Sequence, residues 1–430
     1  MSLLSWGRYP IPVKQDEQRV HWRDEIRRIV SAQKRMLPRG LGRSYGDSCL
    51  LSQGTLIEMT SLNRVIAFDA ERGVIRVEAG MSFADVLAVI VPKGWFLPVS
   101  PGTKFVTIGG AIANDIHGKN HHESGTFGSH VRSFELVRSD GTAQICSTTE
   151  HAELFFATIG GLGLTGCISW AEIQLMPISS SVMEGVYTAF EGVGKFVSLS
   201  DQSTAPYTVA WIDASSDAVK GIFMEGWHAE KSELVYAPKQ LFSIPFLAPG
   251  GLLSSFSVGI FNHLYGFLQR MMPSRRRAVS IDSFFYPLDS IGNWNRLYGK
   301  QGFIQYQFVV PDSASSVIHE VLFRLRQAGH LSFLTVLKKF GTRSSPGLLS
   351  FPQPGLTLAL DLPFRTELLP LLERLDQLVL AAGGRLYPAK DARMSAETFQ
   401  KGYPRWRELE QVRDKAITSD FWERVTKPLL

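Results

Sequence analysis

The sequence predicts an α+β fold in two parts. Between residues 74 and 128 the pattern is a strand, a helix, a second strand and then a glycine-rich stretch. Beyond residue 300, apolar and alternating strand patterns stand beside two amphipathic helix patterns. Composition changes after Pro177, in the serine-rich run 178–181, and we place a boundary there. With 430 residues, the chain is long enough for two domains or for one large one.

Composition and charge narrow the class of protein. Hydrophobic residues make up 44% and charged residues 20% of the chain, as in ordinary globular proteins. The net charge of +5 suits an anionic ligand or membrane surface, but no long basic run predicts nucleic-acid binding. Cys49, Cys146 and Cys167 form no CxxC pair, which argues against disulfides and suits a reducing compartment. Without a signal-peptide pattern or ~18 consecutive apolar residues, we expect a cytoplasmic protein with no spanning helix.

The first third of the chain carries one strand pattern and two helix patterns. A short amphipathic helix is predicted within residues 15–37, with an apolar face formed by Trp22, Ile26, Ile29 and Val30. Residues 74–79 alternate between apolar and charged side chains, which predicts a half-buried strand. Ser82 followed by Asp85 is typical of a helix start, and that helix should end near Pro92 and Gly94.

Two glycine-rich stretches follow the pattern of ligand-binding loops. The first is PRGLGRSYGD, residues 38–47; the second is PGTKFVTIGGAIANDIHGKNHHESGTFG, residues 101–128, with six glycines. Glycine lets the backbone approach a ligand closely, and successive free N–H groups form anion-binding concavities. We interpret the second stretch as a loop around a large anionic cofactor. For the first stretch alone, a plain surface turn is an equal alternative.

Four histidines in and beside the second stretch raise a metal hypothesis. A metal site would use His117, His121, His122 and His130. Gly118 and Asn120 weaken the helix that an i, i+4 pair would need, and no acidic ligand has suitable spacing. We therefore predict no metal, and we expect His121, His122 and His130 to cap turns or to bond backbone groups.

Residues 161–166 fit the pattern G-x-G-x-x-G, but not a Rossmann fold. A Rossmann nucleotide site would need a helix directly after the glycines. The following residues, CISWAEIQLMP, alternate instead and predict a strand that ends at Pro177.

The second half carries its own elements. Residues 302–311 alternate, with Ile304, Tyr306 and Phe308 on one face and Gln305 and Gln307 on the other. A helix over 312–329, capped by Asp312 or Ser313, would bury Val317, Ile318, Val321, Leu322 and Leu325. Strands over 332–339 and 356–362, a helix over 368–382 and helical structure from Ala396 complete the pattern.

Residues 237–277 are apolar, are interrupted by glycine and proline, and end in the basic run 275–277. Apolar residues next to a basic cluster are typical of a segment on an anionic membrane surface. The alternative is a loop and a helix that fold inward and cover a pocket.

Five motifs together carry a family resemblance: PRGLGRSYGD, GGAIANDIHGKNHH, GGLGLTG, GFIQYQFVVP and GGRLYPAKDAR. The chain resembles the decaprenylphosphoryl-β-D-ribose 2′-oxidases, which are FAD-dependent members of the vanillyl-alcohol-oxidase superfamily. The resemblance implies a flavin domain over 1–177, to which residues 386–430 return, and an antiparallel-sheet substrate domain over 178–385. The active site would lie between the two domains.

The resemblance also implies the cofactor and its contacts. FAD would be held by Arg39, Gly40, Leu41, Gly42, Arg43, Ser44, Tyr45, Gly46, Pro101, Gly102, Thr107, Gly109, Gly110, Asn114, His117, Gly118, Gly166, Ile168 and Tyr387. Related flavoenzymes often carry a histidine in the first loop that bonds the flavin covalently. The matching position here is Arg43, and because a guanidinium is a poor nucleophile we predict non-covalent FAD.

The residues expected at the substrate come from the same resemblance. The catalytic set is Lys390, His117, Gln307 and Lys338, and the substrate contacts are Lys119, Trp211, Gln305, Gln307, Lys338 and Lys390. From the residues alone the alternatives stay open. Both glutamines could face solvent, both Lys338 and Lys390 could be surface lysines, and Trp211 could be a core aromatic.

The implied reaction is oxidation of the 2′-hydroxyl of a polyprenyl-phosphoryl-β-D-ribose to the 2′-keto sugar. A separate short-chain reductase would then reduce the ketone and complete an epimerisation to the arabinose form. The protein would be cytoplasmic, with peripheral contact at the inner face of the membrane. Two alternatives remain: an aldonolactone or alditol oxidase that acts on a soluble sugar, and a non-catalytic flavin- or lipid-binding subunit.

Overall fold

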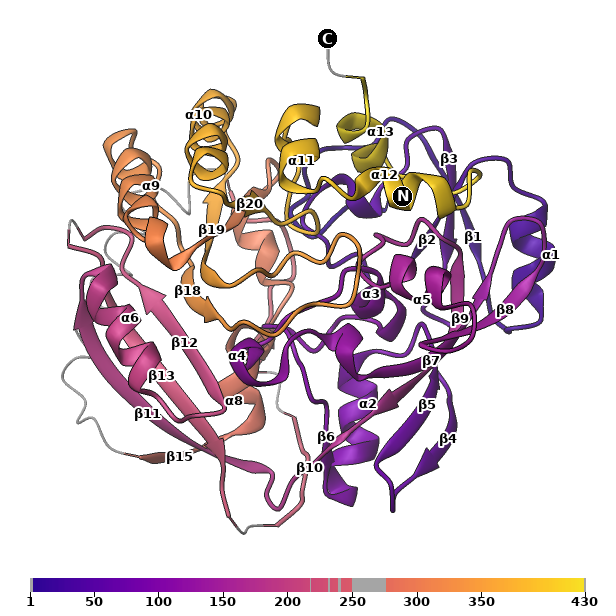
Figure 1. Cartoon of the computed structure of the whole chain (residues 1–430), viewed down its shortest axis with the longest axis horizontal. Coiled ribbons are helices and arrows are strands. Elements are labelled where there is room, and N and C mark those ends of the chain that lie inside the picture. Colours follow the sequence, from indigo (N-terminus) through magenta and orange to yellow (C-terminus); the bar gives the residue numbers. More distant parts are fainter. Residues whose placement is uncertain (1–2, 217, 231–232, 239–240, 250–275, 429–430) are drawn as a thin grey trace.

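The computed structural model describes residues 3–428 except 217, 231–232, 239–240 and 250–275 (Figure 1). Helices and sheets are both present in every large part of the chain, so the α+β prediction is confirmed. In Figure 1 the N-terminal strands lie on one side and a large sheet from the middle of the chain lies on the other. Among the described residues, no helix has the length and apolar character needed to cross a membrane.

A small parallel sheet contains the N-terminal residues. Its strand order is β1 (Gln15–Arg19), β3 (Gly54–Glu58) and β2 (Met36–Arg39), and α1 (Glu25–Ser31) connects β1 to β2. Ile26, Ile29 and Val30 are buried as predicted, but Trp22 precedes the helix and is 56% exposed. The short helix is therefore present, but Trp22 is not part of its apolar face. The strand β1 was missed because it lies at the sheet edge and its side chains are polar and mostly exposed.

A five-stranded antiparallel sheet follows. Its order is β4 (Val65–Asp69), β5 (Val74–Glu78), β9 (Cys167–Gln174), β7 (Val131–Val137) and β8 (Ala143–Ser147). Ser82 caps α2 (Phe83–Ile90) by accepting a hydrogen bond from the Asp85 N–H at 3.1 Å, as predicted. The short strands β6 (Trp95–Phe96) and β10 (Met176–Pro177) pair with each other, and α5 (Ala152–Thr158) precedes the third glycine-rich turn.

The second glycine-rich stretch is not entirely a loop. It contains α3 (Ile108–Ala113) and α4 (His121–Ser124). Thr107 caps α3 by accepting from the Gly110 N–H at 3.2 Å. A Cβ at Gly109 would lie 3.2 Å from the Ala79 carbonyl oxygen. The missing side chain at Gly109 therefore lets α3 pack closely against Ala79, and Gly109 does not form a turn. That packing allows a helix despite two adjacent glycines.

The largest sheet has eight strands, and every neighbouring pair is antiparallel. Its order is β15 (Arg277–Ser280), β11 (Val182–Glu191), β13 (Lys220–His228), β12 (Tyr207–Ile212), β18 (Thr335–Phe340), β19 (Gly355–Pro363), β17 (Phe303–Val310) and β20 (Arg385–Leu386). The helices α6 (Val193–Gln202), α9 (Ser316–Gln327) and α10 (Leu368–Ala381) lie along the outside of this sheet (Figure 1).

The apolar stripe predicted for α9 is buried in the core under these helices. The predicted cap is wrong, because Asp312 and Ser313 lie in a preceding 3-10 turn and Ser315 occupies the position before the helix. Asp312 instead forms an ion pair with Lys339 at 3.0 Å.

The C-terminal residues lie next to the N-terminal part. The helices α11 (Ala396–Gly402), α12 (Trp406–Val412) and α13 (Asp420–Val425) lie beside the N-terminal strands in Figure 1. The Met36 N–H donates to the Ala416 carbonyl at 2.9 Å. The domain limits at residues 177 and 385 stay a prediction.

The middle of the chain is partly described. The helix α8 (Ile281–Phe285) and the paired strands β14 (Phe242–Ser243) and β16 (Ile291–Gly292) frame this region. Most of the apolar segment predicted over 237–277 lies outside the described residues.

Candidate active site

A cavity of about 300 Å³ collects residues from every motif that the sequence singled out. Its wall contains the first glycine-rich loop, parts of residues 101–117 and 162–168, the inner face of the eight-stranded sheet, and the turn 387–390. All predicted cofactor contacts except Gly46 and Gly118 line it, and so do all four predicted catalytic residues. The motifs therefore meet in space, although the chain separates them by hundreds of residues.

The first loop offers unused hydrogen-bond donors to the cavity. Gly42 has φ +61°, and within the described chain the N–H groups of Leu41, Gly42 and Arg43 find no acceptor. The Arg39 side chain is 7% exposed and donates from Nη2 to the Leu4 carbonyl at 2.7 Å, whereas its buried Nη1 has no partner among the described groups. A turn of backbone N–H groups over a buried guanidinium fits the diphosphate of a dinucleotide cofactor.

Two glycines elsewhere in the wall leave room for a ligand. A Cβ at Gly102 or at Gly163 would meet no heavy atom within 4 Å. Both residues line the cavity, so a side chain at either position would stand where a ligand could approach the backbone. These observations fit FAD, whose flat ring system and diphosphate both require close contact.

Arg43, which the resemblance aligns with a flavin-bonding histidine, lies in the cavity wall. Its guanidinium carbon lies 3.8 Å from the centroid of the Trp6 ring and 5.4 Å from that of Phe105. Burial lowers the pKa of Arg43, while the nearby Asp289 carboxylate opposes that shift. Arginine stays protonated at physiological pH, so this side chain can stack on or bond the cofactor but does not attack it.

Gln307 and His117 form a buried pair at the sheet end of the cavity. The Gln307 Nε2 donates to His117 Nε2 at 3.3 Å and approaches the Thr357 hydroxyl at the same distance. Burial, and then the positive charge of Lys338, lowers the pKa of His117 well below its ordinary value. The ring is therefore neutral, and in this arrangement its proton is on Nδ1, which has no hydrogen-bond partner in the described chain. It can donate one hydrogen bond to a bound group.

Two lysines with lowered pKa values lie in the same wall. Burial lowers the pKa of Lys338 to about 8. Burial also lowers the pKa of Lys390 to about 7, and its Nζ lies 3.7 Å from the centroid of the Tyr45 ring. A lysine whose pKa is near 7 can exchange a proton with a substrate at physiological pH.

The alternation of the sheet explains why these side chains meet. Gln305 and Gln307 of β17 lie opposite Asp361 and Ala359 of β19, and Lys338 of β18 lies opposite Thr357. Cross-strand partners share a face, so the polar side chains gather on one side of the sheet. Ile304, Tyr306 and Phe308 point to the opposite side, as predicted, and join the core under the helices.

One important residue was missed from the sequence. Asp361 is fully buried and accepts a hydrogen bond from Gln305 Nε2 at 2.5 Å. Burial raises its pKa to about 7, and its second oxygen, Oδ2, has no hydrogen-bond partner in the described chain. A carboxylate inside the apolar strand LTLALDL was the available signal, because an isolated buried charge is costly.

Four predicted residues do not line the cavity. The Lys119 Nζ donates instead to the Phe284 carbonyl, and it lies 3.4 Å from that of Phe285. Trp211 is buried in β12, opposite Val336 of the next strand. Gly46 and Gly118 pack against neighbouring backbone. A Cβ added at Gly46 would lie 1.8 Å from the Asp391 carbonyl oxygen, and one added at Gly118 would lie 2.8 Å from the Ser100 carbonyl oxygen.

The remaining histidines contact backbone groups, as predicted. His122 Nε2 bonds the Ala205 carbonyl at 3.0 Å, and His130 Nε2 bonds the Ser124 carbonyl at 2.9 Å. His121 Nδ1 accepts from the Gly341 N–H at 3.3 Å. The described part of the chain contains no cluster of three potential metal ligands.

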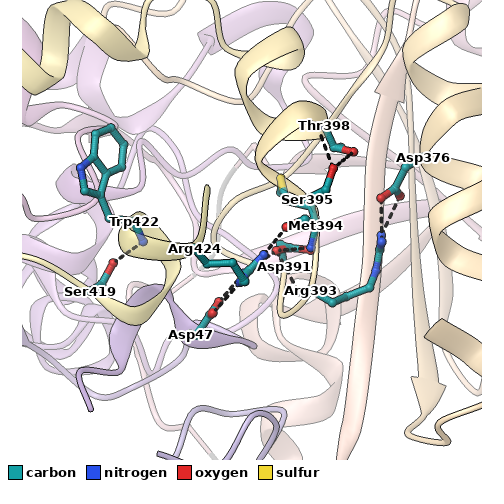
Figure 2. Close-up of polar contacts among 10 residues, drawn as sticks. All are labelled: Asp47, Asp376, Asp391, Arg393, Met394, Ser395, Thr398, Ser419, Trp422 and Arg424. Atoms are coloured by element: carbon teal, nitrogen blue, oxygen red, sulfur yellow. Dashed lines mark hydrogen bonds and ion pairs between the residues drawn. The ribbon is translucent and has the colours of Figure 1, made fainter. Parts of the chain in front are cut away.

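Ion pairs hold the turn that carries Lys390 (Figure 2). The Asp391 carboxylate accepts from the backbone N–H groups of Arg393 and Met394 at 3.0 Å. It also binds Arg424 of α13 at 2.9 Å, and Arg424 in turn binds Asp47 at the end of the first loop. The helix α13 therefore connects the first glycine-rich loop to the turn that carries Lys390.

Comparison with known proteins agrees with this geometry. A family model described as an FAD binding domain matches residues 19–147. Across 98% of the chain and 97% of the relative, the sequence is 36% identical to decaprenylphosphoryl-β-D-ribose oxidase of Mycolicibacterium smegmatis. It is 34% identical, across 78% of the chain and 97% of the relative, to an uncharacterized protein in the mprA 5′ region of Streptomyces coelicolor.

A shorter match, over 29% of the chain and 24% of the relative, is 31% identical to delta(24)-sterol reductase of Homo sapiens.

The family resemblance inferred from the five motifs is confirmed by the near full-length match to the mycobacterial oxidase. The matched FAD binding domain contains both glycine-rich loops that supply donors and space to the cavity. The chain belongs to the decaprenylphosphoryl-β-D-ribose oxidase family and is an FAD-dependent oxidoreductase.

Proposed function

We propose that the protein oxidises the 2′-hydroxyl of a polyprenyl-phosphoryl-β-D-ribose to the 2′-keto sugar. The observation that carries the proposal is the meeting of Lys390, Lys338 and the Gln307–His117 pair in one cavity wall. The printed name of the mycobacterial relative supports the sugar and its phosphoryl lipid.

The reaction removes two electrons and two protons from the carbinol. FAD, when bound, accepts the carbon-bound hydrogen together with the electron pair. Lys390 takes the hydroxyl proton as a neutral amine, and the electron pair of the O–H bond forms the carbonyl. The lowered pKa of about 7 supports this role, since a large fraction of Lys390 is unprotonated near neutral pH.

The other polar groups bind and orient. Lys338, with a pKa of about 8, is mostly protonated near neutral pH and attracts an anionic group of the substrate. His117 is neutral and can donate from Nδ1 to a sugar oxygen, and the hydrogen bond from Gln307 fixes the orientation of its ring. The apolar part of the wall excludes water from the reacting carbon.

Reductive trapping of the product tests the position of oxidation. Borodeuteride reduces a ketone to both epimeric alcohols and leaves deuterium at the former carbonyl carbon. We expect ribose and arabinose products that carry deuterium at C2′ alone. Deuterium at another carbon, or none after full turnover, would contradict the proposed reaction.

The keto product requires a further reaction. A short-chain reductase that delivers hydride to the 2′-ketone would give the arabinose form. A coupled assay with such a reductase and a nicotinamide cofactor should convert the ribose lipid to the arabinose lipid only when both proteins are present. Conversion by the reductase without this chain would contradict the proposed order of steps.

We also propose peripheral contact with the inner face of the membrane, which would present a lipid-linked substrate. Support comes from Leu241, Phe242 and Phe246, which are 73%, 54% and 70% exposed. Apolar side chains at a surface favour the headgroup region of a bilayer. Cosedimentation with vesicles that contain anionic lipid should fall in the double variant Phe242→Asp, Phe246→Asp. It should not fall in Phe323→Asp, whose side chain is 40% exposed on the distant helix α9.

A further inference from the structure

We propose that Asp361 is a positioning residue for Lys390, and that it acts through Gln305, through Tyr45 and through its own negative charge. Asp361 does not line the cavity, so it is not expected to touch the substrate. The inference rests on the proposed function because it concerns the group that takes the proton. It deepens that proposal by assigning a role to a buried carboxylate that the reaction itself does not use.

The first contact joins two strands. Asp361 of β19 lies directly opposite Gln305 of β17, and its Oδ1 accepts from Gln305 Nε2 at 2.5 Å. The backbone at Asp361 is fixed as well, because its N–H donates to the Ser332 hydroxyl at 3.0 Å and to the Leu334 carbonyl at 3.1 Å. The carboxylate therefore holds the Gln305 amide in one orientation.

The next contacts lead to the lysine. Burial raises the pKa of Tyr45, and the Gln305 side chain is among the groups that oppose this shift. The ring of Tyr45 lies under the Lys390 ammonium group, with 3.7 Å between Nζ and the ring centroid. A cation held over an aromatic face is stabilised by the negative potential of the ring. Asp361 thus orients Gln305, whose side chain acts on Tyr45, and the Tyr45 ring holds the Lys390 ammonium group in place.

The charge of Asp361 acts in addition to these contacts. Within the described chain no basic nitrogen lies within 4.0 Å of the Asp361 carboxylate, and its Oδ2 is buried without a hydrogen-bond partner. A buried carboxylate in that position stabilises the nearest cation through a low-dielectric interior. Among charged groups, Asp361 raises the pKa of Lys390, and Lys338 of β18 lowers it.

The other titratable groups near Lys390 do not replace this effect. Tyr45 and Tyr298 are neutral because burial raises their pKa values, and His117 is neutral because burial lowers its pKa. Asp361, whose own pKa burial raises to about 7, is then the acidic group that opposes Lys338 at this end of the cavity when it is ionised. Removal of its charge should leave Lys390 more readily deprotonated, whether Lys390 acts as a base or as an anchor.

The test measures protonation of Lys390 directly in the FAD-loaded protein. Trace acetylation with acetic anhydride at a series of pH values, read by peptide mass spectrometry, gives the pH at which Lys390 is half reactive. In Asp361→Asn this pH should fall by at least about one unit, the smallest effect usual for a close opposite charge. Asp213→Asn is the matched control. Asp213 is also buried, and among the described residues its carboxylate accepts hydrogen bonds from the backbone N–H and the hydroxyl of Ser215.

Activity provides the second measurement. The pH profile of kcat should have a limb whose midpoint equals the half-reactive pH of Lys390. This midpoint should move to lower pH in Asp361→Asn and stay in place in Asp213→Asn. An unchanged half-reactive pH in a folded, FAD-loaded Asp361→Asn protein would overturn the inference. A purely structural role would lower kcat at every pH without moving either midpoint, which also overturns it.

A second variant keeps the inference testable if Asp361→Asn does not fold. Gln305→Leu removes the donor that stabilises the Asp361 anion, so Asp361 should become protonated and Lys390 should again react at lower pH. An unchanged midpoint in this variant contradicts the inference. Acetylation needs no substrate, so a wild-type protein that ignores the ribose lipid would overturn the proposed function alone.

Discussion

The guanidinium of Arg424 binds the carboxylate of Asp47 through two hydrogen bonds of 2.7 and 2.9 Å, although 377 residues separate them. Arg424 also binds Asp391 at 2.9 Å, next to Lys390 (Figure 2). A single side chain from α13 therefore fixes the distance between the first glycine-rich loop and the turn that carries Lys390.

Replacement of Arg424 by Met should destabilise the protein and weaken FAD binding together. Asp47 is buried, with 3% of its surface exposed, so loss of its partner leaves an uncompensated carboxylate. We expect a loss of about 2 kcal/mol in the free energy of unfolding. This is less than the loss for a fully buried pair, because the Arg424 side chain is 26% exposed. Urea unfolding and flavin-fluorescence titration measure the two effects. Arg405→Met, at an exposed pair in the same tail, should change neither.

Lys390→Ala should keep its FAD and lose most of its turnover. Lys390 lines the cavity and is the base in the proposed reaction, and loss of a general base commonly lowers kcat by about a hundred- to ten-thousandfold. Absorbance of the purified variant reports the bound flavin, and steady-state kinetics report kcat. The catalytic role would be wrong if the variant lost its flavin but any reconstituted fraction turned over normally.

The pH profile of kcat should be bell-shaped. Turnover needs Lys390 unprotonated and Lys338 protonated in the proposed reaction. Because burial lowers the pKa of both lysines toward neutrality, activity should rise as Lys390 loses its proton and fall as Lys338 loses its own. Lys338→Met should abolish the alkaline limb and keep the acidic one. A profile that is flat from pH 6 to 9 with an isotope effect on the C–H bond would contradict both assignments.

Gly102→Ala should fold normally and bind FAD less tightly. A Cβ at Gly102 meets no protein atom within 4 Å, yet the residue lines the cavity. We expect the dissociation constant for FAD to rise by at least about tenfold, or ~1.4 kcal/mol. Gly194→Ala in α6 is the matched control, because its Cβ also meets nothing but lies far from the cavity wall. Equal FAD affinity in the two variants would remove Gly102 from the cofactor site.

Acid precipitation should release the flavin into solution. Arg43 lies in the cavity wall with its guanidinium stacked on Trp6, and a protonated guanidinium has no nucleophilic nitrogen that could bond the flavin. A supernatant that contains all the flavin would agree with non-covalent binding. A yellow precipitate that resists repeated acid washing would show a covalent bond elsewhere in the chain.

Local sequence patterns predicted the loops and strand faces of the site, whereas the roles of its residues came from the family resemblance. The alternation at β17 placed Gln305 and Gln307 on one face, and the structure puts both in the cavity wall. Ser82 and Asp85 marked the start of α2 correctly, since a cap depends only on neighbours in the chain. Glycine clusters located the loops because close backbone approach restricts the choice of residue.

Contacts between distant segments were not predictable in this way. The carbonyl groups that hold Lys119 come from α8, more than 160 positions later in the chain. The role of Asp361 depends on the strand register between β17 and β19, which the spacing of either strand alone does not fix. The polar edge strand β1 escaped detection because it has no apolar face to produce a period-2 pattern.

The most direct test of the account is an anaerobic absorbance titration of the FAD-loaded protein with a polyprenyl-phosphoryl ribose. The account predicts stoichiometric bleaching of the flavin band near ~450 nm, the loss expected when a flavin accepts hydride. The same titration with a free alditol or an aldonolactone should leave the spectrum unchanged. The result that would contradict the proposed substrate is a flavin band that stays unchanged with the ribose lipid but is bleached by a soluble sugar. That result would favour a soluble-sugar oxidase.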